Sequence, residues 1–143
     1  MLNDRQQIMN SKTRVLIIDD DVSLSRLMRL MLEKTQMYEV SVENRPAGAM
    51  ATARAFKPGL ILLDLDMPGK DGGQVAREME ADPILKHAKI IFITALVSKN
   101  ETGMTPHIRK GIRYLAKPVD PMTLIDTIED VLSFPTEHAS AGV

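Results

Sequence analysis

Four polar signals follow four short apolar runs of this chain, and their side chains could act together. They are Asp19-Asp20-Asp21 after residues 15–18, Asp64 after residues 60–63, Thr94 after residues 90–93 and Lys117 after residues 114–116. In a parallel α/β sheet, ligands bind beyond the carboxyl ends of the strands. Carboxylates, a hydroxyl and an ammonium gathered at one such edge would suit a hard divalent cation and a phosphoryl group.

The acidic signals favour a cation site. Asp19, Asp20 and Asp64 would lie on neighbouring strand ends if the first and third apolar runs form adjacent strands. Carboxylates that lie close together repel one another, and a bound divalent cation relieves the repulsion. Oxygen-only ligands favour Mg²⁺, Mn²⁺ or Ca²⁺. Asp21 stands directly before a helical pattern and is better explained as a helix cap.

The hydroxyl and the ammonium favour a phosphoryl group beside the cation. Lys117 stands between an apolar run and Pro118, where its ammonium could neutralise a carboxylate and later pair with a phosphoryl oxygen. Thr94 precedes the small residue Ala95, so its hydroxyl has room beside it for an incoming group. Each signal is weak alone, but their combination at four strand ends is strong.

The elements that must position these residues alternate between short β-rich runs and helical periodicity. We expect strands at residues 14–18, 38–42, 60–63, 90–93 and 112–116. Helices are predicted after the first, second, third and fifth of these runs, with Pro46 and Pro121 in the first turns of two of them. Such alternation implies right-handed crossovers and a mostly parallel sheet.

A fourth helix is due at residues 97–111, where Gly103 and Pro106 oppose a regular one. We therefore expect an irregular fourth helix. The organised part is predicted over residues 14–132 as one domain, with a flexible lead-in at residues 1–13 and a flexible tail at residues 133–143.

Composition excludes several classes of function. The chain has 143 residues, a formal net charge of -1 and no cysteine. Such a charge offers no basic field for nucleic acid or an anionic membrane. The absence of cysteine excludes disulfides, thiolate zinc sites and a cysteine nucleophile. The longest apolar runs have about five residues, against the roughly 20 of a membrane helix. We expect a cytoplasmic location and no membrane insertion.

The chain resembles the receiver domain of bacterial two-component response regulators, including the chemotaxis receivers. The matching segments are VLIIDDD at residues 15–21, LILLDLDMPGKDG at 60–72, ITA at 93–95 and YLAKP at 114–118. The resemblance covers nearly all of residues 14–132. It implies a single flavodoxin-like, doubly wound α/β fold with five parallel strands in the order 2-1-3-4-5 and helices on both faces of the sheet.

The resemblance also implies roles for the site residues. Asp64 would be the phosphoacceptor. Mg²⁺ (or Mn²⁺) would be held by Asp20 directly, by Asp19 mainly through water, by Asp64 and by the backbone carbonyl of Asp66. Thr94 and Lys117 would bind the phosphoryl oxygens, with a cis Lys117-Pro118 bond. Tyr114 would be the aromatic switch that turns inward when Thr94 moves toward the phosphate.

A receiver of this kind is a signalling domain and catalyses only its own phosphorylation and dephosphorylation. The resemblance implies a histidine kinase or a histidine phosphotransfer protein as phosphodonor, and an unidentified protein as downstream target. No DNA binding is expected, because residues 133–143 are too few for a helix-turn-helix domain and no basic patch appears.

Two alternatives stay open. A haloacid-dehalogenase-like phosphatase would use Asp64 as nucleophile and Asp66 as acid, but its acidic metal pair follows the lysine, whereas Asp19-Asp20 precedes the nucleophile. A pseudo-receiver would bind partners without being phosphorylated, although every expected site residue is present. Whether the acidic Asp66 would repel or orient an attacking water is also left open.

Overall fold

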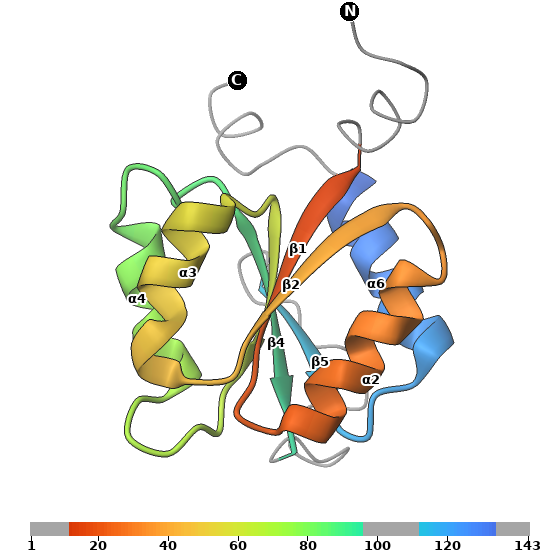
Figure 1. The fold of residues 1–143 in the computed structure, drawn as a ribbon, viewed down its shortest axis with the longest axis horizontal. Helices are drawn as coiled ribbons and strands as arrows, with labels where there is room; N and C mark the ends of the chain where they lie inside the picture. Colours follow the sequence, from red (N-terminus) through yellow and green to blue (C-terminus); the bar gives the residue numbers. More distant parts are fainter. Residues whose placement is uncertain (1–11, 96–111, 134–143) are drawn as a thin grey trace, which may run out of the picture.

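The computed structural model describes residues 12–95 and 112–133 (Figure 1). Residues 1–11, 96–111 and 134–143 are outside this part. The predicted irregular fourth helix and most of the predicted flexible chain ends therefore lie outside the described residues. Of the residues assigned to those ends, Thr13 begins the first strand and Ser133 ends the last described helix.

A sheet of five parallel strands forms the centre of the described chain. The strands are β1 (Thr13–Ile18), β2 (Tyr38–Glu43), β3 (Leu60–Asp64), β4 (Lys89–Thr94) and β5 (Arg113–Ala116). Their order is β2-β1-β3-β4-β5, which confirms the expected 2-1-3-4-5 sheet. All four pairings are parallel.

The helices follow the predicted runs, with one correction. They are α2 (Val22–Glu33), α3 (Ala49–Phe56), α4 (Gly72–Glu80) and α6 (Pro121–Ser133), with a 3₁₀ turn η1 (Pro46–Gly48) before α3. Pro46 therefore opens a 3₁₀ turn and the α-helix begins three residues later. The N-terminus of α2 is capped by Asp21 and that of α4 by Asp71, whose carboxylates accept from the backbone N–H groups of Leu24 and Gln74.

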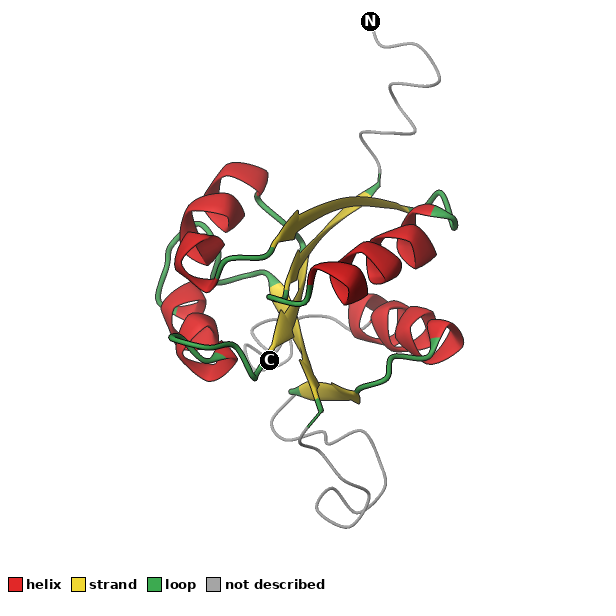
Figure 2. Cartoon of the chain, turned by 60° about the horizontal axis from the view of Figure 1, so that its bottom comes forward, coloured by secondary structure: helices red, strands yellow, loops and turns green. Residues whose placement is uncertain are grey.

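The helices cover both faces of the sheet, α2 and α6 on one face and α3 and α4 on the other (Figures 1 and 2). Successive residues of β1 point to opposite faces, so Val15 and Ile17 pack against α2 and α6, while Leu16 and Ile18 pack against α3 and α4. All four are fully buried, which explains why this strand is apolar at every position.

The register of the sheet places the polar signals in one row. Ile18 pairs with Leu63, Asp64 with Ile93 and Thr94 with Ala116. Asp19 and Lys117 come directly after two of these residues in the chain. The crevice lies where strand order reverses between β1 and β3, and this is where α/β sheets of this class bind their ligands.

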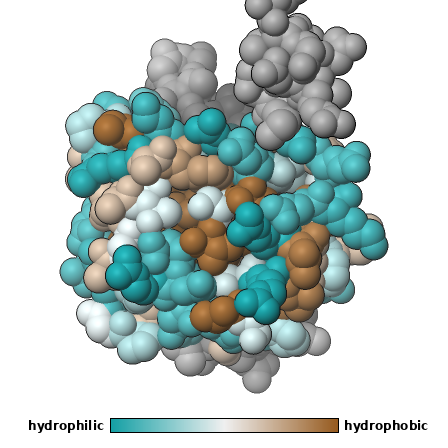
Figure 3. Space-filling view, viewed as in Figure 1, coloured by the Kyte–Doolittle hydropathy of each residue, from teal (hydrophilic) through white to brown (hydrophobic). Residues whose placement is uncertain are grey.

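Apolar side chains also reach the surface. Figure 3 shows them, in brown, interspersed with hydrophilic ones on the face that carries α2 and the edge strand β2. Val22, Leu27 and Leu30 of α2 are each about half exposed. None of the helices in the described ranges is both long and apolar enough to span a bilayer.

Candidate functional site

Three carboxylates meet at the carboxyl end of β1 and β3. Asp19, Asp20 and Asp64 each bring an oxygen to within 4.8 Å of the others. Asp19 is 0% and Asp64 1% exposed, whereas Asp20 faces solvent. The structure thus brings together the three aspartates that the strand ends predicted.

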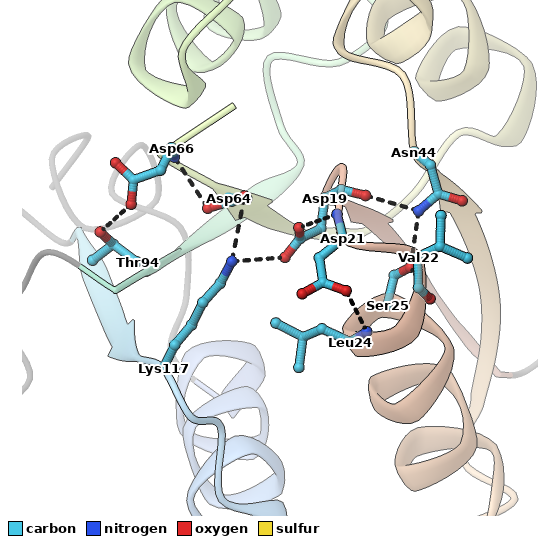
Figure 4. A network of polar contacts seen from close by, with 10 residues as sticks. All are labelled: Asp19, Asp21, Val22, Leu24, Ser25, Asn44, Asp64, Asp66, Thr94 and Lys117. Atoms are coloured by element: carbon cyan, nitrogen blue, oxygen red, sulfur yellow. Dashed lines mark hydrogen bonds and ion pairs between the residues drawn. The ribbon is translucent and has the colours of Figure 1, made fainter. Parts of the chain in front are cut away.

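The turn between β1 and α2 is held from several sides, which fixes Asp19. Its Oδ1 accepts a hydrogen bond from the backbone N–H of Asp21 at 2.8 Å, and its own N–H donates to the Glu43 carbonyl at 3.2 Å. Asn44 Nδ2 donates to the Asp19 carbonyl and to Ser25 Oγ, both at 2.8 Å. Figure 4 shows Asn44 bridging the end of β2 to this turn.

Sequence reasoning did not find Asn44. It comes directly after β2, so the strand-end rule applies to it as it does to Asp19. The four polar signals predicted from the sequence follow the other four strands. Asn44 contacts the backbone of Asp19 and holds its position.

Lys117 lies over the buried carboxylates. Its Nζ is 3.3 Å from Asp19 Oδ2 and 3.4 Å from Asp64 Oδ2. Its backbone N–H donates to the Thr94 carbonyl at 3.0 Å, which anchors the residue at the end of β5. Asp19 Oδ2 is buried and accepts no hydrogen bond within the described residues, so the ammonium is its main compensation there.

Burial and charge shift the ionisation of this group. Burial raises the pKa of Asp19 to about 6, helped by the negative charge of Asp64 and opposed by the Asp21 N–H and the Lys117 ammonium. For Lys117, burial disfavours the charged form, but the two carboxylates outweigh it and raise the pKa of the ammonium. Lys117 therefore stays positively charged, and the carboxylates around it carry more negative charge than its ammonium balances.

The turn after β3 joins Asp64 to β4. The backbone N–H of Asp66 donates to Asp64 Oδ1 at 3.0 Å, and the N–H of Leu65 donates to the Ile93 carbonyl at 2.9 Å. Gly72 packs against this turn so closely that a Cβ there would lie 2.3 Å from the Asp64 carbonyl oxygen. Glycine is required at this position because the helix start approaches the strand end so closely.

Thr94 is almost fully buried at the end of β4. Its Oγ1 donates to the Asp66 carboxylate at 2.9 Å (Figure 4). The predicted hydroxyl is therefore at the expected edge of the sheet and is hydrogen-bonded to the second residue after Asp64. This side-chain contact of Asp66 was not predicted.

The chain also matches a known protein family over most of its length. The family model described as the response regulator receiver domain matches residues 15–129. The chain belongs to this family. The receiver thus has the fold and the signalling class that its motifs implied, and the phosphatase alternative loses its basis.

Individual relatives agree. The receiver is 37% identical to protein PilH of Pseudomonas aeruginosa over 121 residues, which are 84% of this chain and 98% of PilH. It is 33% identical to the response regulator PleD of Caulobacter vibrioides, but spans only 26% of that longer protein. A crystal structure of a response regulator signal receiver domain from Bermanella marisrubri superposes with a TM-score of 0.70 at 27% identity, covering 85% of this chain and 99% of that one.

The donors of the receiver fit a hard divalent cation. The cluster offers carboxylate oxygens alone, and one of them, Asp19 Oδ2, is buried without a hydrogen bond from the described residues. Mg²⁺ and Mn²⁺ prefer such oxygen ligands and retain water, which the exposed side of Asp20 admits. The carbonyl of Asp66 remains a predicted further ligand.

Two other expectations concern the neighbourhood of Lys117. The Lys117-Pro118 peptide bond is cis, as the resemblance implied. Tyr114 is half-buried and stacks on Phe92, with ring centroids 5.4 Å apart and planes at 25°. Its role as a switch remains a prediction.

Asp21 caps α2 by accepting a hydrogen bond from the Leu24 N–H at 3.0 Å, which confirms the helix-cap interpretation.

Proposed function

We propose that this receiver takes a phosphoryl group onto Asp64 from a phosphohistidine of a histidine kinase or a histidine phosphotransfer protein. The observation that carries the proposal is the setting of the Asp64 carboxylate. It is buried at the family's acceptor position, between the Lys117 ammonium and the backbone N–H of Asp66. A buried carboxylate with an ammonium on one side and the carboxylates of a metal site on the other is suited to accepting an anionic phosphoryl group.

The reaction exchanges one bond to phosphorus for another. A carboxylate oxygen of Asp64 bonds to phosphorus while the bond from phosphorus to the donor imidazole nitrogen breaks, and the electron pair stays on the imidazole. Catalysis of such transfers depends on positioning and on neutralising charge at the transferred oxygens. The Asp66 N–H orients Asp64, and Lys117 contributes its charge.

Mg²⁺ held by Asp19, Asp20 and Asp64 would supply further positive charge beside the transferred oxygens. The chain's own residues must then redistribute their partners. Lys117 now pairs with Asp19 and Asp64, and it would pair with a phosphoryl oxygen once Asp64 is esterified. Thr94 would donate its hydroxyl to a second oxygen, since it lies buried in the same row of strand ends.

In the product, a phosphoryl group with about two negative charges at pH 7 replaces the single charge of the Asp64 carboxylate. We propose that the rearrangement of Thr94 and Tyr114 changes a surface that a downstream protein recognises, and that the receiver acts in the cytoplasm. Apart from its own phosphorylation and dephosphorylation, we propose no reaction for it. The pseudo-receiver alternative predicts binding without a phosphoryl adduct.

Intact-mass spectrometry tests the proposal. The full chain is incubated with Mg²⁺ and acetyl phosphate, and one labile phosphoryl group is expected. Asp64→Asn should lose the adduct, whereas the matched variant Asp126→Asn, an exposed aspartate on α6, should keep it. Absence of an adduct with acetyl phosphate and with phosphoramidate would promote the pseudo-receiver. Multiple turnover of unrelated phosphomonoesters would revive the phosphatase.

A further inference from the structure

Asp66 connects the phosphoacceptor to β4 through two different groups. Its backbone N–H donates to Asp64 Oδ1, and its carboxylate accepts the hydrogen bond from Thr94 Oγ1. Dashed lines in Figure 4 join Asp66 to both Asp64 and Thr94. Thr94 is 1% exposed and Asp66 is a surface residue, so this bond joins a buried hydroxyl to an exposed carboxylate.

The hydrogen bond occupies the group that phosphoryl binding needs. A threonine hydroxyl has one proton to donate. While that proton is donated to Asp66, it is not available to a phosphoryl oxygen on Asp64. The backbone of Thr94 is held separately, because its carbonyl accepts the Lys117 N–H. The side chain can therefore change partner while β4 and β5 stay paired.

We infer that the Asp66 carboxylate is a positioning residue that holds the Thr94 hydroxyl in the unphosphorylated arrangement and releases it when Asp64 is phosphorylated. The inference rests on the proposed function of Asp64. The incoming phosphoryl group repels the Asp66 carboxylate and offers the hydroxyl a new charged acceptor. One charge-assisted hydrogen bond then replaces another, so the exchange requires no unpaired buried hydroxyl.

In this arrangement the Asp66 carboxylate disfavours the movement of the Thr94 hydroxyl toward Asp64. Removing its carboxylate removes this competing acceptor, so the Thr94 hydroxyl turns toward Asp64 more readily before the phosphoryl group is present. Asp66→Ala should therefore bind a phosphoryl mimic about three to ten times more tightly than the wild type, since the net contribution of a typical hydrogen bond is of this order. The fold should survive the change, because Asp66 is exposed and belongs to neither core cluster.

Simple charge repulsion would also make Asp66→Ala bind an anion more tightly, and a double-mutant cycle separates the two causes. Binding of beryllofluoride with Mg²⁺ is measured by calorimetry in the full chain for four proteins: wild type, Asp66→Ala, Thr94→Val and the double variant. Valine keeps the shape of threonine but has no hydroxyl. If Asp66 acts through Thr94, most of the gain from Asp66→Ala disappears in the Thr94→Val background.

A second readout needs no mimic. In the absence of beryllofluoride, the Thr94 methyl NMR signal of Asp66→Ala should move toward its position in the mimic-bound wild type. The matched control Glu80→Ala removes an exposed carboxylate at the end of α4 and should change neither readout.

The outcomes distinguish the inference from the function on which it rests. An equal gain from Asp66→Ala in both backgrounds, or no gain with an unmoved methyl signal, would overturn the positioning role while leaving Asp64 as acceptor. A wild type that binds no beryllofluoride and forms no adduct would overturn both.

Discussion

Asp82 and Asp19 are both buried in this receiver, but their surroundings shift the carboxyl pKa in opposite directions. Asp82, after α4, pairs with Arg54 at 2.7 Å and accepts the Ile84 N–H at 2.8 Å. These bonds, of which the one from Arg54 has the largest effect, hold the pKa of Asp82 below its usual range. Asp19, at the carboxyl edge of the sheet, has a buried oxygen with no hydrogen bond from the described residues and a raised pKa.

This difference in hydrogen bonding distinguishes a carboxylate that stabilises the fold from one that is kept available for a ligand. A carboxylate that serves the fold has its partners built in, so it favours the folded state when ionised. A carboxylate that serves a ligand must keep acceptor capacity in reserve, and the protein is less stable for it until the ligand arrives. Asp19 and its neighbours match the second description, and the predictions below test that contrast.

The largest effect is expected at Lys117, the cation that balances Asp19 and Asp64. Lys117→Met should slow phosphorylation by acetyl phosphate about a hundredfold or more, because one preorganised donor to a reacting oxygen is worth this much. The rate is followed by intact mass at saturating Mg²⁺. Lys89→Met is the matched control, since Lys89 donates to the Val131 carbonyl, far along the sheet from the acceptor. Equal rates for Lys117→Met and wild type would contradict the role given to the ammonium.

Asp19→Asn should stabilise the metal-free protein. At pH 7.5 in EDTA, the free energy of unfolding should rise by about 1–3 kcal/mol, since a buried charge that folding disfavours is removed. Urea unfolding measures the change. Adding Mg²⁺ should stabilise the wild type and have a much smaller effect on Asp19→Asn. A variant less stable than the metal-free wild type would show that Asp19 serves the fold.

The pH dependence has a defined sign. The pKa of Asp19 is raised from 3.8 to about 6, so the folded protein binds more protons than the unfolded chain between these values. The stability of metal-free wild type relative to Asp19→Asn should therefore fall as the pH rises from about 4 to about 6, and then level off. Urea midpoints across this range provide the measurement. A stability difference between wild type and Asp19→Asn that does not change with pH would contradict a raised pKa of Asp19.

Asn44→Ala should weaken Mg²⁺ binding about tenfold, as loss of an outer partner of a metal ligand commonly does. Asn44 holds the Asp19 carbonyl and Ser25 Oγ, so its loss loosens the turn that carries the acidic pair. Calorimetric titration with Mg²⁺ gives the affinity. Thr35→Ala is the control, because Thr35 lies in the turn after the C-terminal end of α2, whereas the acidic pair precedes its N-terminal end. Unchanged Mg²⁺ affinity in Asn44→Ala would reduce Asn44 to a local structural contact.

The smallest change is expected at Asp82, and its sign is opposite to that at Asp19. Asp82→Asn should lower the urea midpoint at pH 7.5, because the pair with Arg54 is lost. The pKa of Asp82 is lowered in the folded state, so its contribution to stability is fully present above the ordinary aspartate pKa and is lost as the pH falls below that value through the lowered folded pKa. Phosphorylation should be unaffected. A stabilised Asp82→Asn would remove the contrast between the two carboxylates.

Much of this architecture could be predicted from local patterns. The strands and four helices follow from apolar periodicity and turn residues, and the parallel register then brings Asp19, Asp64, Thr94 and Lys117 to one edge. The roles of these residues stay predictions. The bond from Thr94 to Asp66 and the bridge from Asn44 were not foreseen, because hydrogen-bond directions depend on turn geometry that no spacing encodes. The 3₁₀ turn at Pro46 was missed because proline suits the first turn of both helix types.

The central claim is that Asp64 carries the phosphoryl group. Borohydride reduces an acyl phosphate to an alcohol, so trapping the phosphorylated receiver and sequencing its peptides by mass spectrometry locates the modified residue. The account predicts conversion of Asp64 to homoserine, dependent on Mg²⁺ and on the phosphodonor. Conversion of Asp19, Asp20 or Asp66 instead, or of no residue in a protein that bears the adduct, would contradict it.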